Sequence, residues 1–254
     1  MTSSKVKLTF AYSTLASRAK NIEFPENSAN REFIVLVQNP SKDQYQTPNS
    51  DAKVIELKGK GVAKSRNAAL KYGSGEYLIF GDDDITFNEA GLNTLVEYFD
   101  KHPECAIIMA QTVDESGQLR KQYPQKPHKL TKFNSAKAAT YEMMVRLDAI
   151  REKEINFDEN FGAGADNFLG DEYIFIADAL KKGLKGVFLP VVVAVHPKDS
   201  SGSAWGTQRD LSARAKVFSR VFGIWAPAIR ALFLLKSRKG AVGVVNALRF
   251  IIGR

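Results

Sequence analysis

The sequence predicts an α/β fold in which a mostly parallel sheet is flanked by helices. Short apolar runs alternate with helical patterns from the start of the chain, and this alternation is typical of parallel strands joined by crossovers. Predicted strands cover residues 7–11, 33–38, 54–57, 77–80 and 106–110, and predicted helices cover residues 62–72 and 89–102. The run at residues 77–80 contains only aromatic and aliphatic residues, which indicates a strand buried on both faces.

The second half of the chain continues this pattern after an irregular segment. Residues 114–135 are rich in Lys, Gln and Pro and show little periodicity, so we expect an excursion without regular structure. We then expect a strand at residues 140–147, glycine-containing turns at 156–170, a helix at 171–182 and a strand at 187–195 that ends on His196.

Length and composition predict a folded globular chain. With 254 residues, of which 44% are hydrophobic, the sequence can bury a full core. The single cysteine, Cys105, lies in an apolar run, so we expect neither a disulfide framework nor a cysteine metal site, and a reducing cytoplasm fits this usage. The first residues lack the apolar stretch of a signal peptide, and no run of about 18 apolar residues predicts a simple membrane span.

The excess basic charge of the chain is concentrated at its C-terminal end. The last 46 residues hold ten Lys and Arg and one acidic residue, Asp210, which leaves 26 basic and 27 acidic residues for positions 1–208. We therefore expect a main domain of ordinary charge at residues 1–207 and a basic helical extension at residues 208–254.

Two apolar stripes with helical spacing run through this extension. The first contains Leu211, Ala215, Phe218 and Phe222, and the second contains Ala241, Val244, Val245, Leu248, Ile251 and Ile252, with basic residues such as Arg230 around them. A basic amphipathic helix suits an anionic membrane surface, so one interpretation is peripheral attachment to the inner face of the cell membrane. The alternative is a helical hairpin that packs on the main domain or on a second copy, which leaves oligomerisation open. Nucleic acid is disfavoured because aromatic residues that stack on bases are sparse there.

Three adjacent aspartates, Asp82, Asp83 and Asp84, follow the buried strand at residues 77–80. Ligands of open α/β sheets bind at the carboxyl ends of strands. Adjacent carboxylates repel one another unless a cation lies between them, and oxygen ligands select hard divalent ions such as Mg²⁺ or Mn²⁺. The sequence therefore predicts a divalent cation site, and the alternative is an acidic cap for a helix beginning near Phe87.

Two further features are candidates for the same site. The acidic pair Asp171-Glu172 follows the glycine-containing turns, and His196 ends an apolar strand. A carboxylate can act as a general base, and a histidine can ligate a metal. Each also has a structural alternative, which is a capping pair for the predicted helix in the first case and a local hydrogen-bonding residue in the second.

Two ordered motifs resemble the family 2 glycosyltransferases of the GT-A fold. The first runs from Lys64-Ser65-Arg66-Asn67-Ala68-Ala69-Leu70 to the three aspartates, and the second comprises Asn156-Phe157-Asp158-Glu159-Asn160-Phe161-Gly162, Gly170-Asp171-Glu172 and His196. The resemblance covers roughly residues 5–200. It implies a glycosyltransferase that moves a sugar from a nucleotide sugar, with a UDP-sugar as first candidate, to a saccharide or lipid-linked acceptor in surface polysaccharide or glycolipid synthesis.

The resemblance also implies roles for individual residues. Asp82 and Asp84 would form the DxD-type element that holds Mn²⁺ or Mg²⁺ against the donor diphosphate, with His196 as a further ligand. Glu172 is the expected general base, Asp171 is the second choice, and direct displacement would invert the anomeric centre. The expected nucleotide-sugar contacts are Ser13, Thr14, Arg18, Gln38, Asn39, Lys64, Arg66, Asp82 and Asp83. For Lys64 and Arg66 a solvated helix face is the alternative.

The chain departs from the family pattern at two places. Glu172 stands where aspartate is usual, so its carboxylate must be set back by one methylene. Residues 16–31 replace the full helix that usually follows the first strand, which predicts a shortened first crossover. Two other functions stay open: a nucleotidyltransferase on a related fold, although residues 5–18 lack its Gly-rich loop with Lys, and a non-catalytic membrane- or nucleic-acid-binding scaffold.

Overall fold

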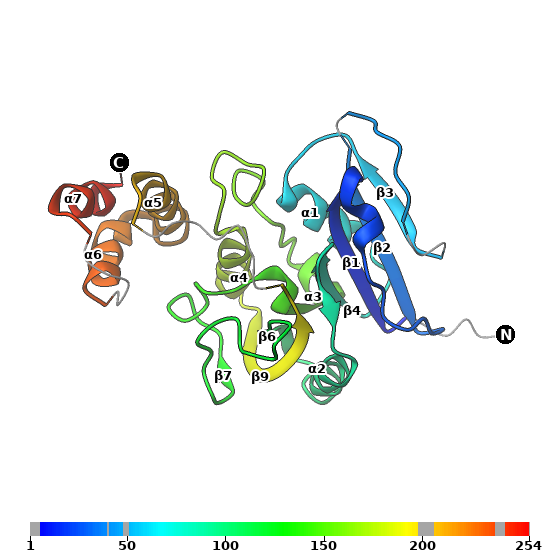
Figure 1. Ribbon diagram of the computed structural model, residues 1–254. Helices are drawn as coiled ribbons and strands as arrows, with labels where there is room; N and C mark the ends of the chain where they lie inside the picture. Colours follow the sequence, from blue (N-terminus) through cyan, green and yellow to red (C-terminus); the bar gives the residue numbers. More distant parts are fainter. Residues whose placement is uncertain (1–5, 40, 48–50, 198–205, 237–241, 254) are drawn as a thin grey trace.

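One nine-stranded sheet forms the centre of the molecule (Figure 1). The computed structural model describes residues 6–39, 41–47, 51–197, 206–236 and 242–253. The strands are β1 (Leu8–Leu15), β2 (Arg31–Gln38), β3 (Lys53–Leu57), β4 (Tyr77–Asp82), β5 (Thr86–Phe87), β6 (Cys105–Val113), β7 (His128–Lys129), β8 (Met143–Arg146) and β9 (Lys185–Val195). Their order is β3-β2-β1-β4-β8-β6-β9-β5, and β7 pairs with β9.

The longer strands of this sheet are mostly parallel, as the sequence predicts. β1 pairs in parallel with both β2 and β4, and β6 pairs in parallel with β9. Only the short strands β5, β7 and β8 run antiparallel to their neighbours among the described residues. The carboxyl ends of β1, β4 and β9 therefore lie at one edge of the sheet, which brings Ser13, Asp82 and His196 to the same side of the molecule.

Helices cover both faces of the sheet and bury two hydrophobic clusters. The first cluster joins α2 (Glu89–Lys101) to one face through Leu92, Leu95 and Phe99. The second cluster joins α1 (Val62–Tyr72), α3 (Leu147–Glu152) and α4 (Asp171–Lys181) to the other face. Side chains of β1 alternate between the two clusters, because Phe10 and Tyr12 enter the first and Ala11 enters the second.

The helices at residues 62–72 and 171–182 and the five early strands lie where they were predicted, within a few residues at their ends. The first crossover is short, as expected, and contains only the 3₁₀ helix η1 (Ala16–Asn21). The strand predicted for residues 140–147 is wrong at both ends. A 3₁₀ helix, η2 (Thr140–Glu142), precedes β8, and α3 begins at Leu147. The two-residue strands β5 and β7 have no periodic signature and were not predicted.

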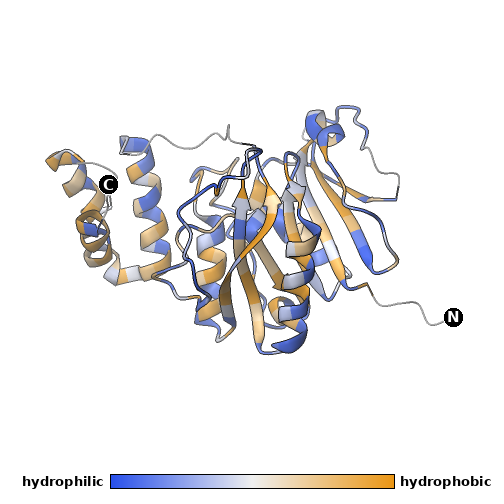
Figure 2. Ribbon diagram, turned by 60° about the horizontal axis from the view of Figure 1, so that its bottom comes forward, coloured by the Kyte–Doolittle hydropathy of each residue, from blue (hydrophilic) through white to orange (hydrophobic). Residues whose placement is uncertain are grey.

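The extension forms a helical group at the end of the molecule opposite to the N-terminus (Figures 1 and 2). It contains α5 (Gln208–Phe222), the 3₁₀ helix η3 (Gly223–Trp225), α6 (Ala226–Lys236) and α7 (Val244–Ile252). The stretch Gln208–Lys236 is long and apolar enough to cross a membrane, judged by length and composition alone. Gly223, with φ of 55°, separates α5 from α6, and the two helices pack against each other.

The two predicted stripes of the extension have different surroundings. Leu211, Ala215 and Phe218 of the first stripe are buried together with Ala226 and Phe250, so this stripe forms the core of the helical group. The second stripe is largely exposed at Val244, Val245, Leu248 and Ile252, while Ala241 lies outside the described residues. Arg230, placed by the sequence among the surrounding basic residues, is instead buried and donates to the carbonyls of Phe250 and Ile251 at the end of α7.

Candidate active site

The carboxyl end of β4 carries the three predicted aspartates, and side chains from the first strand and η1 hold them in place. The Thr14 hydroxyl donates to Asp83 Oδ2 at 2.6 Å. Arg18 forms ion pairs with both Asp83 and Asp84, with Nη2 lying 3.2 Å from Asp84 Oδ2. Thr14 and Arg18, two of the residues predicted to contact the nucleotide sugar, therefore contact the aspartates at the end of this strand.

The pKa of Asp82 reflects first its burial and then the negative charge of its neighbours. Burial raises the pKa of Asp82 to about 6, the charge of Arg66 opposes this shift, and the charges of Asp84 and Asp83 add to it. Burial also raises the pKa of Asp83. A pKa raised in this way indicates that neither solvent nor the neighbouring cations fully compensate the charge of ionised Asp82.

His196 faces this acidic cluster from the end of β9. Its Nδ1 lies 2.7 Å from the carbonyl oxygen of Pro197, and since a carbonyl only accepts, Nδ1 carries the proton and donates. The other ring nitrogen, Nε2, faces the acidic cluster and lies 3.9 Å from Asp84 Oδ1. Histidines that ligate metals commonly have this arrangement, with the second nitrogen donating to a backbone carbonyl.

The donor chemistry of Asp84 and His196 thus fits a divalent ion, but these residues do not form a complete cage. Among the residues that the structure describes, no group of three or more His, Cys, Asp or Glu side chains is arranged to hold an ion. Ions such as Mg²⁺ are often bound by one or two carboxylates together with substrate phosphates, so an incomplete protein shell is compatible with such a site.

The acidic pair Asp171-Glu172 opens α4, and two glycines allow the preceding turn to approach it. Gly170 has φ of 92° and Gly162 has φ of 95°, both in the left-handed region. A Cβ atom on Gly162 would lie 2.7 Å from Asp171 Cγ, so a larger residue there would displace the acidic pair. Asp171 is almost fully buried, with 3% of its side chain exposed, whereas 20% of the Glu172 side chain is exposed.

Arg66 links the acidic pair to the acidic strand end. This buried arginine of α1 forms an ion pair with Asp171, and its Nη1 lies 3.4 Å from Glu172 Oε1. Its charge also interacts with Asp82. The alternative interpretation of Arg66 as part of a solvated helix face is therefore wrong, while Lys64, two residues earlier, is exposed.

The two carboxyl groups of the pair titrate differently. Burial and the charge of Glu172 raise the pKa of Asp171 to about 7. For Glu172 burial opposes ionisation, but the charge of Arg66 together with hydrogen bonds from the backbone, Asp171 and the Thr140 hydroxyl outweighs it, and the pKa is lowered. Glu172 is thus the member of the pair that is both ionised and accessible.

Two predicted donor contacts are already used to hold loops. Gln38 Oε1 accepts from the backbone N–H of Gly61 at 2.8 Å, which ties β2 to the start of α1. The Asn39 side chain makes two 2.8 Å hydrogen bonds with the backbone of Asp43.

Ser13, another residue predicted to contact the nucleotide sugar, is buried near the end of β1, opposite Asp82 in the sheet register.

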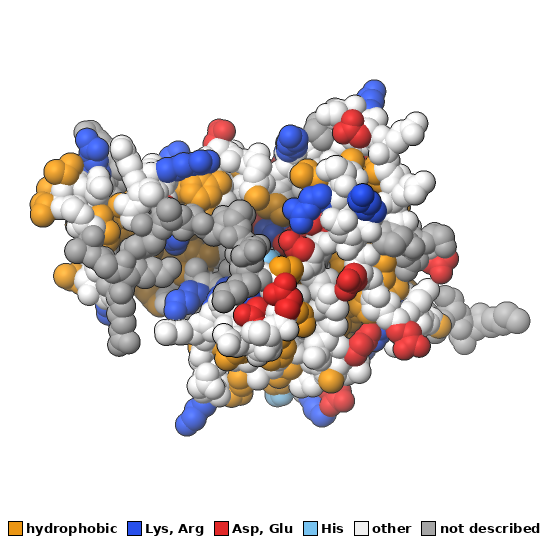
Figure 3. Space-filling view, viewed as in Figure 1, with side chains coloured by type: hydrophobic (Ala, Val, Ile, Leu, Met, Phe, Trp, Pro, Cys, Tyr) orange, Lys and Arg blue, Asp and Glu red, His pale blue; other side chains and the backbone are white. Residues whose placement is uncertain are grey.

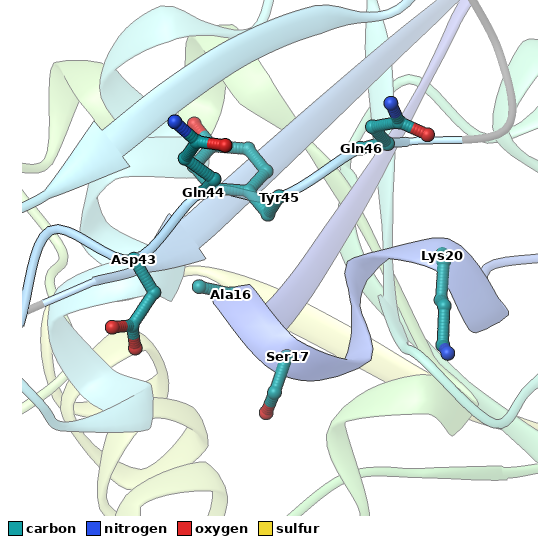
Figure 4. A pocket seen from close by; sticks show the side chains of 7 residues that line it. All are labelled: Ala16, Ser17, Lys20, Asp43, Gln44, Tyr45 and Gln46. Atoms are coloured by element: carbon teal, nitrogen blue, oxygen red, sulfur yellow. The ribbon is translucent and has the colours of Figure 1, made fainter.

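A polar pocket lies beside these strand ends. It has a volume of about 680 Å³ and is formed by η1 on one side and by the segment after β2 on the other (Figure 4). Its lining residues are Ala16, Ser17, Lys20, Asp43, Gln44, Tyr45 and Gln46. Figure 3, viewed from the same side as Figure 1, shows acidic and basic side chains gathered together near the middle of the molecular face.

Thr140 and Tyr141 belong to the site as well, although the sequence did not single them out. The Thr140 hydroxyl donates to Glu172 Oε1 at 2.9 Å, and the Tyr141 ring lies 4.8 Å from the His196 ring. A threonine and a tyrosine at the start of a predicted strand carry no signal of such contacts, because their partners lie more than 30 residues away in the sequence.

Comparison with solved structures identifies the fold. The chain is similar to the crystal structure of S. aureus TarS 1–349, with a TM-score of 0.59 and 15% identity over 97% of this chain and 80% of that one. It is also similar to the same protein in complex with UDP-GlcNAc (TM-score 0.57, 16% identity, 90% and 71% covered) and with UDP (TM-score 0.58, 16% identity, 97% and 80% covered). No curated protein sequence matches the chain significantly.

The architecture is that of a GT-A glycosyltransferase, an enzyme class that uses nucleotide sugars. Residues 26–150, just under half of the chain, match the model of glycosyl transferase family 2. The family match supports the glycosyltransferase over the nucleotidyltransferase and over the non-catalytic scaffold.

Proposed function

We propose that this enzyme transfers a sugar from a nucleotide sugar to a hydroxyl group of a saccharide or lipid-linked acceptor, with inversion and with the help of Mn²⁺ or Mg²⁺. One observation carries the proposal: the guanidinium of Arg66 contacts Asp171 and Glu172 and also interacts electrostatically with Asp82. The expected general base and the acidic strand end therefore interact with the same buried cation.

On the donor side, Asp84 and His196 would hold the ion, with Asp82 beside them. A bound ion supplies positive charge that stabilises the leaving diphosphate. Arg18 contributes a second positive charge at the same place, because its guanidinium already lies on Asp83 and Asp84. Lys64, exposed on the first turn of α1, is placed to meet phosphate oxygens.

The nucleoside would lie at the carboxyl ends of β1 and β2. Ser13, Thr14, Gln38 and Asn39 come from these strand ends, and the 680 Å³ pocket between η1 and the segment after β2 offers amide, carboxylate and aromatic groups next to them. Since the TarS structures contain UDP-GlcNAc and UDP, a uridine nucleotide is the first donor to test.

On the acceptor side, Glu172 would take the proton from the attacking hydroxyl. Its carboxylate is ionised and partly exposed, as a general base requires. Attack from the side opposite to the diphosphate then gives a product of inverted configuration, which NMR of the anomeric proton can establish.

A ligand panel tests this function. UDP together with Mn²⁺ should raise the melting temperature of the full chain by several degrees. Ligand at a hundred times its Kd stabilises the native state by about 2.7 kcal/mol, which for a chain of this size corresponds to roughly 5–10 °C. UDP with EDTA should give a smaller shift. If no nucleotide changes the melting temperature in the presence of Mn²⁺, the donor assignment is wrong.

The extension favours a second role, attachment to an anionic membrane surface where lipid-linked acceptors would lie. Large apolar side chains are exposed along η3, α6 and α7, and apolar atoms are visible at the outer end of this helical group in Figure 3. The residues are Ile224, Trp225, Leu232, Leu235, Val244, Val245, Leu248 and Ile252. Exposed basic residues, Lys236 and Arg249, accompany them, and such a combination suits anionic lipid headgroups.

Vesicle flotation tests the attachment. The full chain should float with phosphatidylglycerol vesicles and less with phosphatidylcholine vesicles. The triple change Ile224→Ser, Trp225→Ser and Leu235→Ser should lower the vesicle partition constant at least about a hundredfold, since each exposed apolar side chain that inserts contributes about 1–2 kcal/mol. Leu119→Ser, an exposed leucine far along the chain from the extension, is the matched control. Unchanged flotation of the triple variant would exclude the membrane role, and a change from dimer to monomer by light scattering would assign the face to a second copy instead.

A further inference from the structure

The three residues of η2 connect the two halves of the site. Thr140 donates to Glu172 on the acceptor side, and Tyr141 lies against His196 on the donor side. Glu142, the third residue, points into a separate buried network. A single turn of the chain therefore contacts both the expected general base and the expected metal ligand.

Glu142 anchors η2 to β6 and to the irregular segment after it. The carboxylate of Glu142, 1% exposed, accepts from Tyr123 Oη at 2.5 Å, from Thr112 Oγ1 at 3.0 Å and from Lys121 Nζ at 2.9 Å. These partners come from β6 and from the irregular segment that follows it. A buried carboxylate with this many partners holds its backbone in one position, because losing any of them would leave a buried polar group unsatisfied.

Glu172 is contacted from other segments of the chain by Thr140 and by Arg66, and the hydrogen bond from Thr140 is the shorter of these two contacts. Thr140 Oγ1 lies 2.9 Å from Glu172 Oε1, whereas Arg66 Nη1 lies 3.4 Å from the same oxygen and makes its closer contact with Asp171. Both of these contacts fall on Oε1. Without Thr140, the Glu172 side chain would lose its hydrogen bond to η2 and keep its contacts with Arg66 and with the neighbouring Asp171.

We infer that Thr140 is a positioning residue, which holds the carboxylate of Glu172 in the orientation needed to deprotonate the acceptor hydroxyl. This inference rests on the proposed role of Glu172 as general base. A fixed orientation matters because misplacing a reacting group by about 1 Å can cost roughly a hundredfold in rate. Thr140 itself is buried, so in this role it acts through Glu172.

Kinetics of Thr140→Val and Thr140→Ser test the inference. Valine keeps the shape of threonine and removes the hydroxyl, so kcat should fall about 10- to 100-fold with little change in the KM for the donor. Since the hydrogen bond favours the charged form of Glu172, its loss raises the pKa of that carboxyl, and the acid limb of the pH–kcat profile should move to higher pH. Thr140→Ser keeps a hydroxyl and should restore most of kcat and the original profile.

The control is Thr94→Val, which removes a threonine hydroxyl bonded to a backbone carbonyl on the exposed face of α2 and should change neither quantity. The UDP-dependent thermal shift shows whether each variant is folded. If Thr140→Val does not fold, Thr140→Ala replaces it in the kinetic comparison. An unchanged kcat, or a lower kcat with an unmoved acid limb, overturns the inference. If Glu172→Gln retains full activity, both the proposed general base and the inference about Thr140 are wrong. If Glu172→Gln is inactive and Thr140→Val is unaffected, only the inference about Thr140 is wrong.

Discussion

Replacing Glu172 by glutamine should lower kcat by about two to four orders of magnitude, the range that a positioned general base contributes. Glutamine keeps the length and the hydrogen bond from Thr140 but cannot accept a proton from the acceptor hydroxyl. Donor binding should persist, because the groups that we assign to the nucleotide lie on η1 and α1 and at the ends of β1, β2, β4 and β9 rather than on α4. The measurement is initial-rate kinetics combined with UDP binding by calorimetry.

Comparison with Asp171→Asn separates the two candidate bases. Asp171 is enclosed and forms the ion pair with buried Arg66, so asparagine there should chiefly reduce stability, by leaving a buried charge without its closest partner. Glu97→Gln, on the exposed face of α2, controls for a general loss of charge. Should Glu172→Gln keep wild-type turnover while Asp171→Asn loses it in the folded state, the roles of the two carboxylates must be exchanged.

Local sequence patterns were sufficient to place the backbone of the catalytic domain. The strand at residues 77–80 and the helix at 62–72 depend on contiguous apolar residues and on stop signals such as Gly73, and the structure has both where they were expected. The acidic strand end also follows from order alone, because charged residues directly after a buried strand must lie at the edge of the sheet. Parallel pairing then brings Ser13 beside Asp82.

Contacts between distant segments were not predictable in the same way. Nothing in the neighbourhood of Thr140 indicates that its hydroxyl reaches Glu172, and nothing near Arg18 indicates that it pairs with Asp83 and Asp84. These contacts depend on how η1 and η2 are placed over the sheet. Both elements are short 3₁₀ turns, which leave little periodic signal in a sequence.

The extension illustrates a related limit. Helical spacing of Leu211, Ala215 and Phe218 correctly indicates an apolar face, but periodicity does not say what covers that face. In the structure it is covered by α6 and α7, and α5 also packs on the catalytic domain through Val217 and through ion pairs of Arg220 with Asp158 and Asp178. The exposed apolar residues therefore come from the later helices.

Replacing Asp84 by asparagine should remove most of the dependence of donor binding and turnover on Mn²⁺ or Mg²⁺ and lower kcat/KM by about two to three orders of magnitude. Stabilisation of a developing phosphate charge by a metal ion amounts to several kcal/mol, and each 1.4 kcal/mol is a factor of ten. Asp84 is the aspartate that faces His196 Nε2, so its loss removes one side of the expected coordination. Calorimetric UDP binding with and without Mn²⁺ measures the loss independently of turnover.

The control for Asp84→Asn is Asp148→Asn, an exposed aspartate in the first turn of α3 with no contact to the site. Combining Asp84→Asn with His196→Ala gives a sharper test, because two ligands of one ion are coupled. The double variant should lose little more than the worse single variant, whereas independent roles would make the two losses add. Additive losses would contradict the proposal that an ion is bound between Asp84 and His196. An Asp84→Asn enzyme that still requires Mn²⁺ at the wild-type concentration would contradict it as well. In that case Arg18, whose guanidinium lies on Asp83 and Asp84, would be the cation that neutralises the donor diphosphate.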